Sequence, residues 1–182
     1  MQLFYSIKSI INEKSLKLVS EANFGRKVDL DRDEKFVKTY SDMVYKLALS
    51  RTRNPSSAAD VFQEVFYRYF KKRPVFLSVE HEKAWLIRVT INCSKSFLTS
   101  FLYKQTVPLD ETHTLHHPEF NDVFDCVMRL PIKYRTVVFL FYYENLSIAE
   151  IAQATNYNEN TIKSHLRRAR ILLKERLTDY EF

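Results

Sequence analysis

Apolar residues recur at helical spacing through the first half of the chain. The pattern predicts one helix that ends near Ser50, a second that a capping box at Ser57 and Asp60 opens, and a third from near Glu82 to Phe101. Their inward positions are Phe36, Tyr40, Val44, Leu47, Ala48, Val61, Phe62, Val65, Phe66, Tyr69, Trp85, Leu86, Val89, Cys93 and Phe97. Because each predicted helix has one apolar face, we expect these faces to form the core of a helical module.

The second half shows the same spacing in shorter segments. A short helix is predicted before Pro131, and another begins there and runs to about Glu144, since proline is tolerated at a helix start. Ser147 and Glu150 form a capping box for a further short helix, and a final helix begins around Glu159. The inward face of this final helix consists of Ile162, Leu166, Ala169, Leu172 and Leu173.

Composition favours an all-α fold. The chain has 182 residues, 46 % of them hydrophobic, which is enough for one domain or two small ones. Its single glycine is Gly25, whereas an average chain would be about 7 % glycine. Without more glycines, neither a P-loop, nor a dinucleotide-binding turn, nor a G-x-S-x-G elbow can be formed, and tightly turned sheets are hard to close.

An acidic stretch divides the two halves. Between Gln105 and Met128 there are five acidic residues and no Lys or Arg, and Pro108 and Pro118 interrupt the periodicity. We therefore expect a flexible acidic linker between two small helical modules. The predicted boundaries are 1–30 for an N-terminal extension without an assigned role, 31–103 for the first module, 104–120 for the linker and 121–182 for the second module.

Positive charge is concentrated in the final helix. The stretch from Thr161 to Thr178 contains six basic residues against the single acid Glu175, and like charges at i, i+4 destabilise an isolated helix. Phosphate groups would compensate this repulsion. A short capped helix, a tight turn and a longer basic helix is the helix-turn-helix arrangement, in which the second helix enters the major groove of DNA. The basic residues are Lys163, Arg167, Arg168, Arg170, Lys174 and Arg176.

Two further polar faces can be interpreted in two ways, as ordinary solvated surfaces or as binding surfaces. The second helix has a polar face that is either a docking surface for a partner or a solvated surface: Asp60, Gln63, Glu64 and Tyr67. The third helix carries cationic and amide side chains beside a loop with an aromatic residue, as pockets for single strands or flipped bases do. These residues are Phe76, Arg88, Asn92 and Lys95.

The remaining residues favour neither an enzyme nor a metal or cofactor site. His113, His116 and His117 lack the cysteines or helical frame of a zinc site. Cys93 and Cys126 are far apart in sequence, which fits a reduced, cytoplasmic compartment better than a disulfide framework. No catalytic set stands out. Charged residues interrupt the apolar positions of the N-terminal segment, so we expect neither a signal peptide nor membrane insertion.

Four blocks, taken together, resemble the extracytoplasmic-function (ECF) sigma factors of bacterial RNA polymerase, which are members of the sigma-70 family. The blocks are VYKLALSRTRNPSSAADVFQEVF (Val44 to Phe66), EKAWLIRVTIN (Glu82 to Asn92), LPIKYRTVVFLFYYENLSIAEIA (Leu130 to Ala152) and NTIKSHLRRAR (Asn160 to Arg170). The resemblance implies that the first module is sigma region 2 and that the second is sigma region 4. It therefore implies a non-catalytic subunit that directs promoter recognition, DNA melting and transcription initiation.

The resemblance also implies three sets of contact residues. Docking on the clamp helices of the largest polymerase subunit falls to Asp60, Gln63, Glu64 and Phe66. Capture of a flipped base in the minus-ten promoter element, with backbone contacts, falls to Phe76, Arg88, Asn92 and Lys95. The minus-thirty-five duplex faces Lys163, Ser164, His165, Arg167 and Arg168.

The chain departs from the family pattern at His165, where arginine is usual, and at Asn156, where glycine is frequent. The expected partners are core polymerase, promoter DNA and, by resemblance alone, an anti-sigma factor. The rival interpretation is a stand-alone helix-turn-helix regulator that binds an operator as a dimer, and it leaves the first module without a role.

Overall fold

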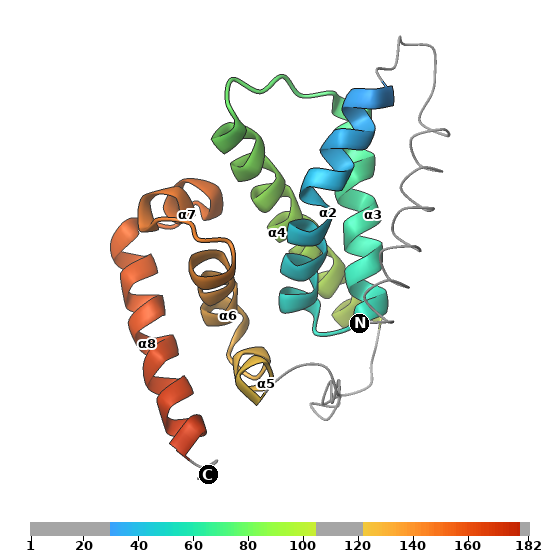
Figure 1. Cartoon of the computed structure of the whole chain (residues 1–182). Helices are drawn as coiled ribbons and strands as arrows, with labels where there is room; N and C mark the ends of the chain where they lie inside the picture. Colours follow the sequence, from blue (N-terminus) through green and yellow to red (C-terminus); the bar gives the residue numbers. More distant parts are fainter. Residues whose placement is uncertain (1–29, 105–121, 179–182) are drawn as a thin grey trace.

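The computed structural model describes residues 30–104 and 122–178, and every regular element in these ranges is a helix (Figure 1). This confirms the all-α class. The helices are α2 (Leu30–Thr52), α3 (Pro55–Lys72), α4 (Val79–Lys104), α5 (Asp122–Met128), α6 (Ile132–Val138), the π-helix η1 (Phe139–Tyr143), α7 (Ile148–Thr155) and α8 (Glu159–Thr178). Most of the N-terminal extension, the linker and the three histidines of the acidic stretch lie outside the described residues.

Helices α2, α3 and α4 form the first module, and α2 packs against both of the others (Figure 1). The predicted inward residues meet here: Val44, Leu47, Val65, Phe66 and Leu86 have no measurable exposure to solvent. Phe36 links α2 to α3 and to the loop before α4, because its ring stacks on Tyr69 with centroids 3.8 Å apart and also contacts Phe76 of that loop.

Helix α3 begins earlier than the sequence predicts. The cap is Asn54, whose side-chain oxygen accepts a hydrogen bond of 2.9 Å from the Ser57 backbone N–H, and Pro55 occupies the first helical position. Asn54 has extended backbone angles, as an N-cap residue needs, and proline suits the position after it. The predicted capping box at Ser57 and Asp60 is therefore wrong, because both residues already lie inside the helix.

Arg73 ends α3 in the left-handed conformation, with φ of 46°. Its guanidinium forms an ion pair with the buried carboxylate of Asp33 on α2 and lies over the Phe70 ring. This pairing compensates the burial of a charge and attaches the start of the next loop to α2.

The second module contains α5 to α8. The predicted capping box is confirmed: Ser147 and Glu150 exchange hydrogen bonds at the start of α7. Asn156 ends α7 with φ of 61°, and Asn158 caps α8 by accepting a hydrogen bond of 2.7 Å from Thr161 N–H. The single helix predicted up to Glu144 is divided instead into α6 and the π-helix η1.

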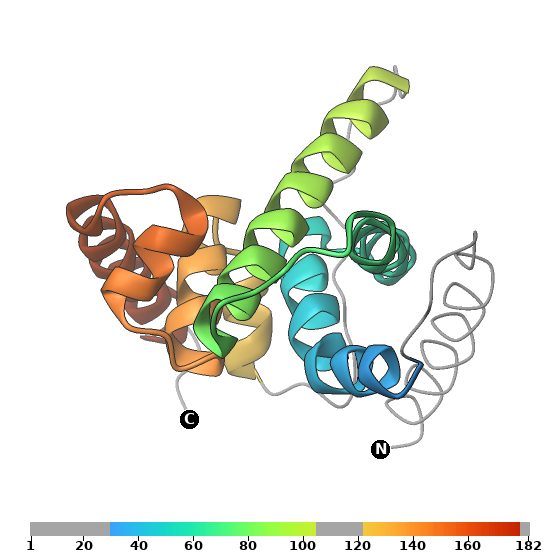
Figure 2. The ribbon, with the colours of Figure 1, turned by 90° about the horizontal axis from the view of Figure 1, so that it is seen from above.

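The two modules pack directly on each other: α6 lies against α2, and α7 lies against α4 (Figures 1 and 2). Their buried side chains join one hydrophobic cluster that includes Leu47 and Leu86 of the first module and Leu140 and Ile151 of the second. Periodicity predicted each apolar face, and the structure shows that part of these faces covers the other module.

Arg135 of α6 is the polar centre of this interface. Its guanidinium donates hydrogen bonds to the carbonyl oxygens of Ser50 and Arg51 in α2 and to those of Met128 and Leu130 in its own module. Burial lowers the pKa of Arg135 to about 10, so the side chain is still charged at pH 7.

Within the described ranges, no helix combines the length and apolar character that a membrane span requires.

Candidate nucleic-acid interface

The outer face of α3 carries the predicted polymerase-docking residues. Asp60 is exposed, while Gln63 and Glu64 are partly exposed on the same side of the helix. Glu64 accepts a hydrogen bond of 2.7 Å from Arg68, one turn further along. The structure brings these three predicted residues together on one surface, which we call the α3 face.

Phe66 does not share this surface. Its side chain is fully buried and packs against Phe62 and Phe36 in the core of the first module. In this conformation Phe66 supports α3 from beneath, and a direct contact with the polymerase is not available to it. Its place in the D-x-x-QEVF block led to the prediction, although helical spacing already put it on the inward face.

The loop between α3 and α4 turns Phe76 inward. The Phe76 ring is parallel to Phe36 at 6.3 Å, and it meets Trp85 and His81 edge-on at 5.7 and 5.6 Å. Its neighbours point the other way, since Val75 is 84 % and Leu77 is 91 % exposed. Phe76 is therefore a half-buried wall of the site, and the most exposed loop side chains are apolar ones that the sequence analysis missed.

The polar stripe of α4 is present as predicted. Arg88, Asn92 and Lys95 are all exposed, and their spacing places them along the same side of the helix. We call this stripe, together with the loop at residues 74–78, the α4 face. At one end it meets α7, because Arg88 donates a hydrogen bond of 2.7 Å to the Gln153 carbonyl. The second module thus contacts one of the predicted DNA-binding residues.

Helix α8 presents a continuous polar and basic surface, which we call the α8 face. The helix itself lies on the side of the second module that is remote from α2 and α4 (Figure 1). The first turns carry four exposed residues that match the prediction: Lys163, Ser164, Arg167 and Arg168. Two basic side chains of this surface have partners within the protein: Lys163 forms an ion pair of 3.6 Å with Glu159, and Arg170 donates a hydrogen bond of 2.9 Å to the Tyr142 hydroxyl.

His165 is not among the exposed residues of α8. Its ring lies between Tyr134 and Tyr157, each edge-on at 5.4 Å between centroids. Burial, together with the nearby charge of Lys133, lowers the pKa of His165 below its ordinary value. A half-buried neutral ring in this position packs α8 against its neighbours and leaves only part of the ring accessible for the predicted contact with the duplex. Its helical spacing from the inward residues Ile162 and Ala169 was the available sequence signal.

Comparisons with known proteins agree with both modules. The family "Sigma-70 region 2" matches residues 36–100, and the family "Sigma-70, region 4" matches residues 120–173. The chain is 27 % identical to the ECF RNA polymerase sigma factor SigW of Bacillus subtilis, over 85 % of this chain and 93 % of that protein. It is 27 % identical to the sigma factor SigV of the same organism, over 74 % of this chain and 84 % of SigV.

A solved structure has the same fold. The sigma factor RpoE from Bartonella quintana, crystallised in complex with the anti-sigma factor NepR, superposes with a TM-score of 0.68 at 20 % identity. The match covers 81 % of this chain and 98 % of that one. A superposition of this extent includes helices of both modules.

Proposed function

The chain belongs to the sigma-70 family and is an ECF sigma factor, which binds core RNA polymerase and initiates transcription without being an enzyme. We propose that three of its surfaces share this task. The α3 face docks on the clamp helices of the largest polymerase subunit. The α4 face holds the unpaired minus-ten strand, and the α8 face binds the minus-thirty-five duplex.

The single observation that carries the assignment is the separation of exposed charge by sign. The α3 face carries the acidic Asp60 and Glu64, the second of which is paired with Arg68, whereas Arg88 and Lys95 lie on α4 and the basic stripe lies on α8. DNA phosphates attract basic surfaces and repel acidic ones. The acidic α3 face therefore suits a protein partner, and the two basic faces suit nucleic acid.

The α4 face has the chemistry that holds an extruded base. Asn92 offers both a donor and an acceptor, and Arg88 and Lys95 can hold the flanking phosphates. Unstacking a base costs a few kcal/mol, and contacts that form only with the extruded base return this cost. DNA melting by this route consumes no nucleotide and requires no catalytic residue.

The α8 face is suited to duplex DNA. The first turns of the second helix of a helix-turn-helix enter the major groove, and the four exposed residues lie there. Arg167 and Arg168 can neutralise phosphates or form bidentate bonds with guanine, while Ser164 can bond to either base. His165 lies among them but is half-buried between Tyr134 and Tyr157, so we propose that it contributes less than the exposed residues.

Two further proposals rest on relatives. RpoE of Bartonella quintana was solved bound to the anti-sigma factor NepR. By analogy, we propose that an anti-sigma protein holds this chain inactive until a signal releases it. We also propose a cytoplasmic location, since its polymerase partner works there.

Reconstitution tests the proposed function. Purified protein and core RNA polymerase are mixed with genomic DNA, and the transcripts are sequenced. We expect transcripts that start downstream of one shared pair of elements, and we expect no specific duplex binding by the free protein in a gel shift. Tight operator binding by a free dimer, without transcripts from the holoenzyme, would favour the stand-alone regulator.

A further inference from the structure

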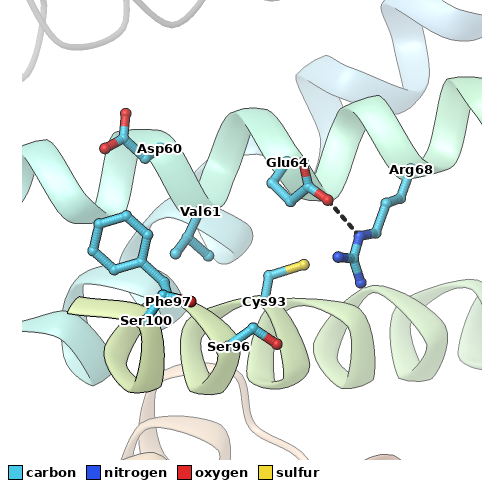
Figure 3. Close-up of a pocket in the computed structure, with 8 residues that line it drawn as sticks. All are labelled: Asp60, Val61, Glu64, Arg68, Cys93, Ser96, Phe97 and Ser100. Atoms are coloured by element: carbon cyan, nitrogen blue, oxygen red, sulfur yellow. Dashed lines mark hydrogen bonds and ion pairs between the residues drawn. The ribbon is translucent and has the colours of Figure 1, made fainter. Parts of the chain in front are cut away.

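A groove of about 470 Å³ runs between α3 and α4 (Figure 3). Its α3 wall consists of Asp60, Val61, Glu64 and Arg68, and its α4 wall of Cys93, Ser96, Phe97 and Ser100. A cavity of about 150 Å³ can hold a benzene-sized ring. The groove therefore has room for more than one apolar side chain of a partner.

The floor of the groove is apolar and its rim is polar. Val61 and Cys93 are almost fully buried at the base, and Phe97 is partly buried beside them. Burial raises the pKa of the Cys93 thiol, so this floor stays uncharged near neutral pH. Binding is favoured when an apolar side chain of a partner displaces water from a floor of this kind.

Charge on the rim differs between its two ends. Glu64 is paired with Arg68 at 2.7 Å, so the charges at that end compensate each other. Asp60 is exposed at the other end, and no ion pair with it is found in the part of the chain that the structure describes. A partner that fills the groove would meet a negative charge at the Asp60 end.

The groove is continuous with the α3 face, since Asp60 and Glu64 belong to both. We propose that the groove is the apolar half of the polymerase-docking surface and receives apolar side chains from a basic helix of the clamp. This inference rests on the proposed docking of the α3 face and extends it to α4. In that arrangement Asp60 orients the partner, and Val61, Cys93 and Phe97 provide the buried contact.

A helix fits the groove better than an extended strand does. The groove lies between two helices, and a third helix can insert one row of side chains between them. Recognition of this kind uses apolar anchors at helical spacing with charged residues beside them. The central anchor positions of such an interface carry most of its binding energy.

Filling the groove tests the proposal. Ser96 and Ser100 are exposed on its α4 wall, so the variants Ser96→Trp and Ser100→Trp place a large ring in it without disturbing the core. We expect each variant to weaken binding to purified core polymerase at least about tenfold by biolayer interferometry. Ser96→Ala, which leaves the groove open, and Thr99→Trp, which adds the same ring to α4 outside the groove, should bind like the wild type.

The results separate this proposal from the function that it rests on. If the wild type binds core polymerase and both groove-filling variants bind equally well, the groove proposal is wrong and the α3 docking stands. If the wild type itself does not bind, the proposed docking fails first. If a variant binds core polymerase more weakly but unfolds at the same temperature as the wild type, the variant is folded and the loss of binding is specific. If sedimentation shows that the wild type is a dimer and that Ser96→Trp is a monomer, a second copy of the chain occupies the groove, and the proposal is overturned.

Discussion

His165 shows how packing decides the role of one residue. Helical spacing places it near the predicted DNA-facing residues, but the rings of Tyr134 and Tyr157 enclose it. One of its ring nitrogens, Nδ1, is buried, and no hydrogen-bond partner for it occurs in the described structure. A cation in this position would lose water without gaining a partner, so the neutral ring is favoured.

The lowered pKa of His165 predicts a specific dependence of stability on pH. Because the unfolded chain protonates this histidine first, its contribution is fully present above about pH 6.5 and is lost as the pH falls through the folded-state pKa. We expect an NMR titration of His165 with a midpoint below about 6.5. His165→Gln should reduce the fall in free energy of unfolding on acidification. A midpoint above the ordinary value would contradict the packing described.

Glu64 is the second residue whose role can be tested alone. Its ion pair with Arg68 is exposed to solvent, and exposed pairs contribute about 1 kcal/mol at most. We therefore expect Glu64→Lys to remove core binding in a pull-down while the unfolding temperature stays nearly constant. Asp42→Lys is the matched control, because Asp42 forms the same kind of i, i+4 pair on α2. Retained binding by Glu64→Lys would count against the α3 face.

At the scale of elements, the local start signals of the helices differ in how specific they are. The Ser147 and Glu150 box predicts the start of α7 correctly, because both members satisfy backbone donors there. The similar pair Ser57 and Asp60 misleads, since Asn54 followed by Pro55 is the stronger start. Two competing caps within one turn cannot be ranked by spacing alone.

Substitution distinguishes these two caps of α3. Asn54→Ala should lower the free energy of unfolding by about 1 kcal/mol, since it leaves backbone donors unsatisfied. For a chain of this size that corresponds to a fall of about 2–4 °C in the unfolding temperature. Ser57→Ala should change stability by less than about 0.5 kcal/mol. If Ser57→Ala lowered the free energy of unfolding more than Asn54→Ala did, the capping box at Ser57 would be the effective start of α3.

The α8 helix yields a prediction on DNA binding. Alanine substitution of Arg167 or Arg168 should weaken use of the minus-thirty-five element in run-off transcription by the holoenzyme. If the lost contact is to a phosphate, the slope of log K against log salt should fall by about 0.9 for each variant. Arg170→Ala is the control, because Arg170 bonds to Tyr142 within the protein. Equal slopes in all three variants would remove the α8 face from the proposal.

At the scale of the whole molecule, the second module covers part of the first. Arg88 bonds to the Gln153 carbonyl, and Lys83 forms an ion pair of 3.1 Å with Glu144. The two promoter elements are named for positions about 25 base pairs apart, which is roughly 85 Å of duplex. On the proposed assignment, the modules therefore have to separate when both elements are bound.

Arg135 holds the modules together in the structure, so its removal should loosen them. Arg135→Ala leaves buried carbonyl oxygens in α2 unpaired and should cost at least about 2 kcal/mol. We expect a larger radius of gyration by small-angle X-ray scattering and thermal unfolding in two steps. Arg129→Ala, which removes an exposed arginine near the end of α5, should change neither. An unchanged radius in Arg135→Ala would show that the apolar cluster alone suffices.

The amino-acid sequence by itself determined the helices, most of their inward faces and the three sets of charged residues. These features depend on periodicity, capping and charge, which act within a few turns of one helix. The motif blocks added the family, which the comparisons confirm.

Only the tertiary structure decided which faces are covered. It packed Phe76 and His165 half-buried against other aromatic rings, placed Phe66 beneath α3, brought Arg135 onto α2 and formed the groove beside Asp60. Each of these outcomes depends on contacts between residues far apart in sequence. Such contacts leave no periodic signal, because whether a polar or aromatic side chain faces solvent depends on the neighbouring element that packs against it.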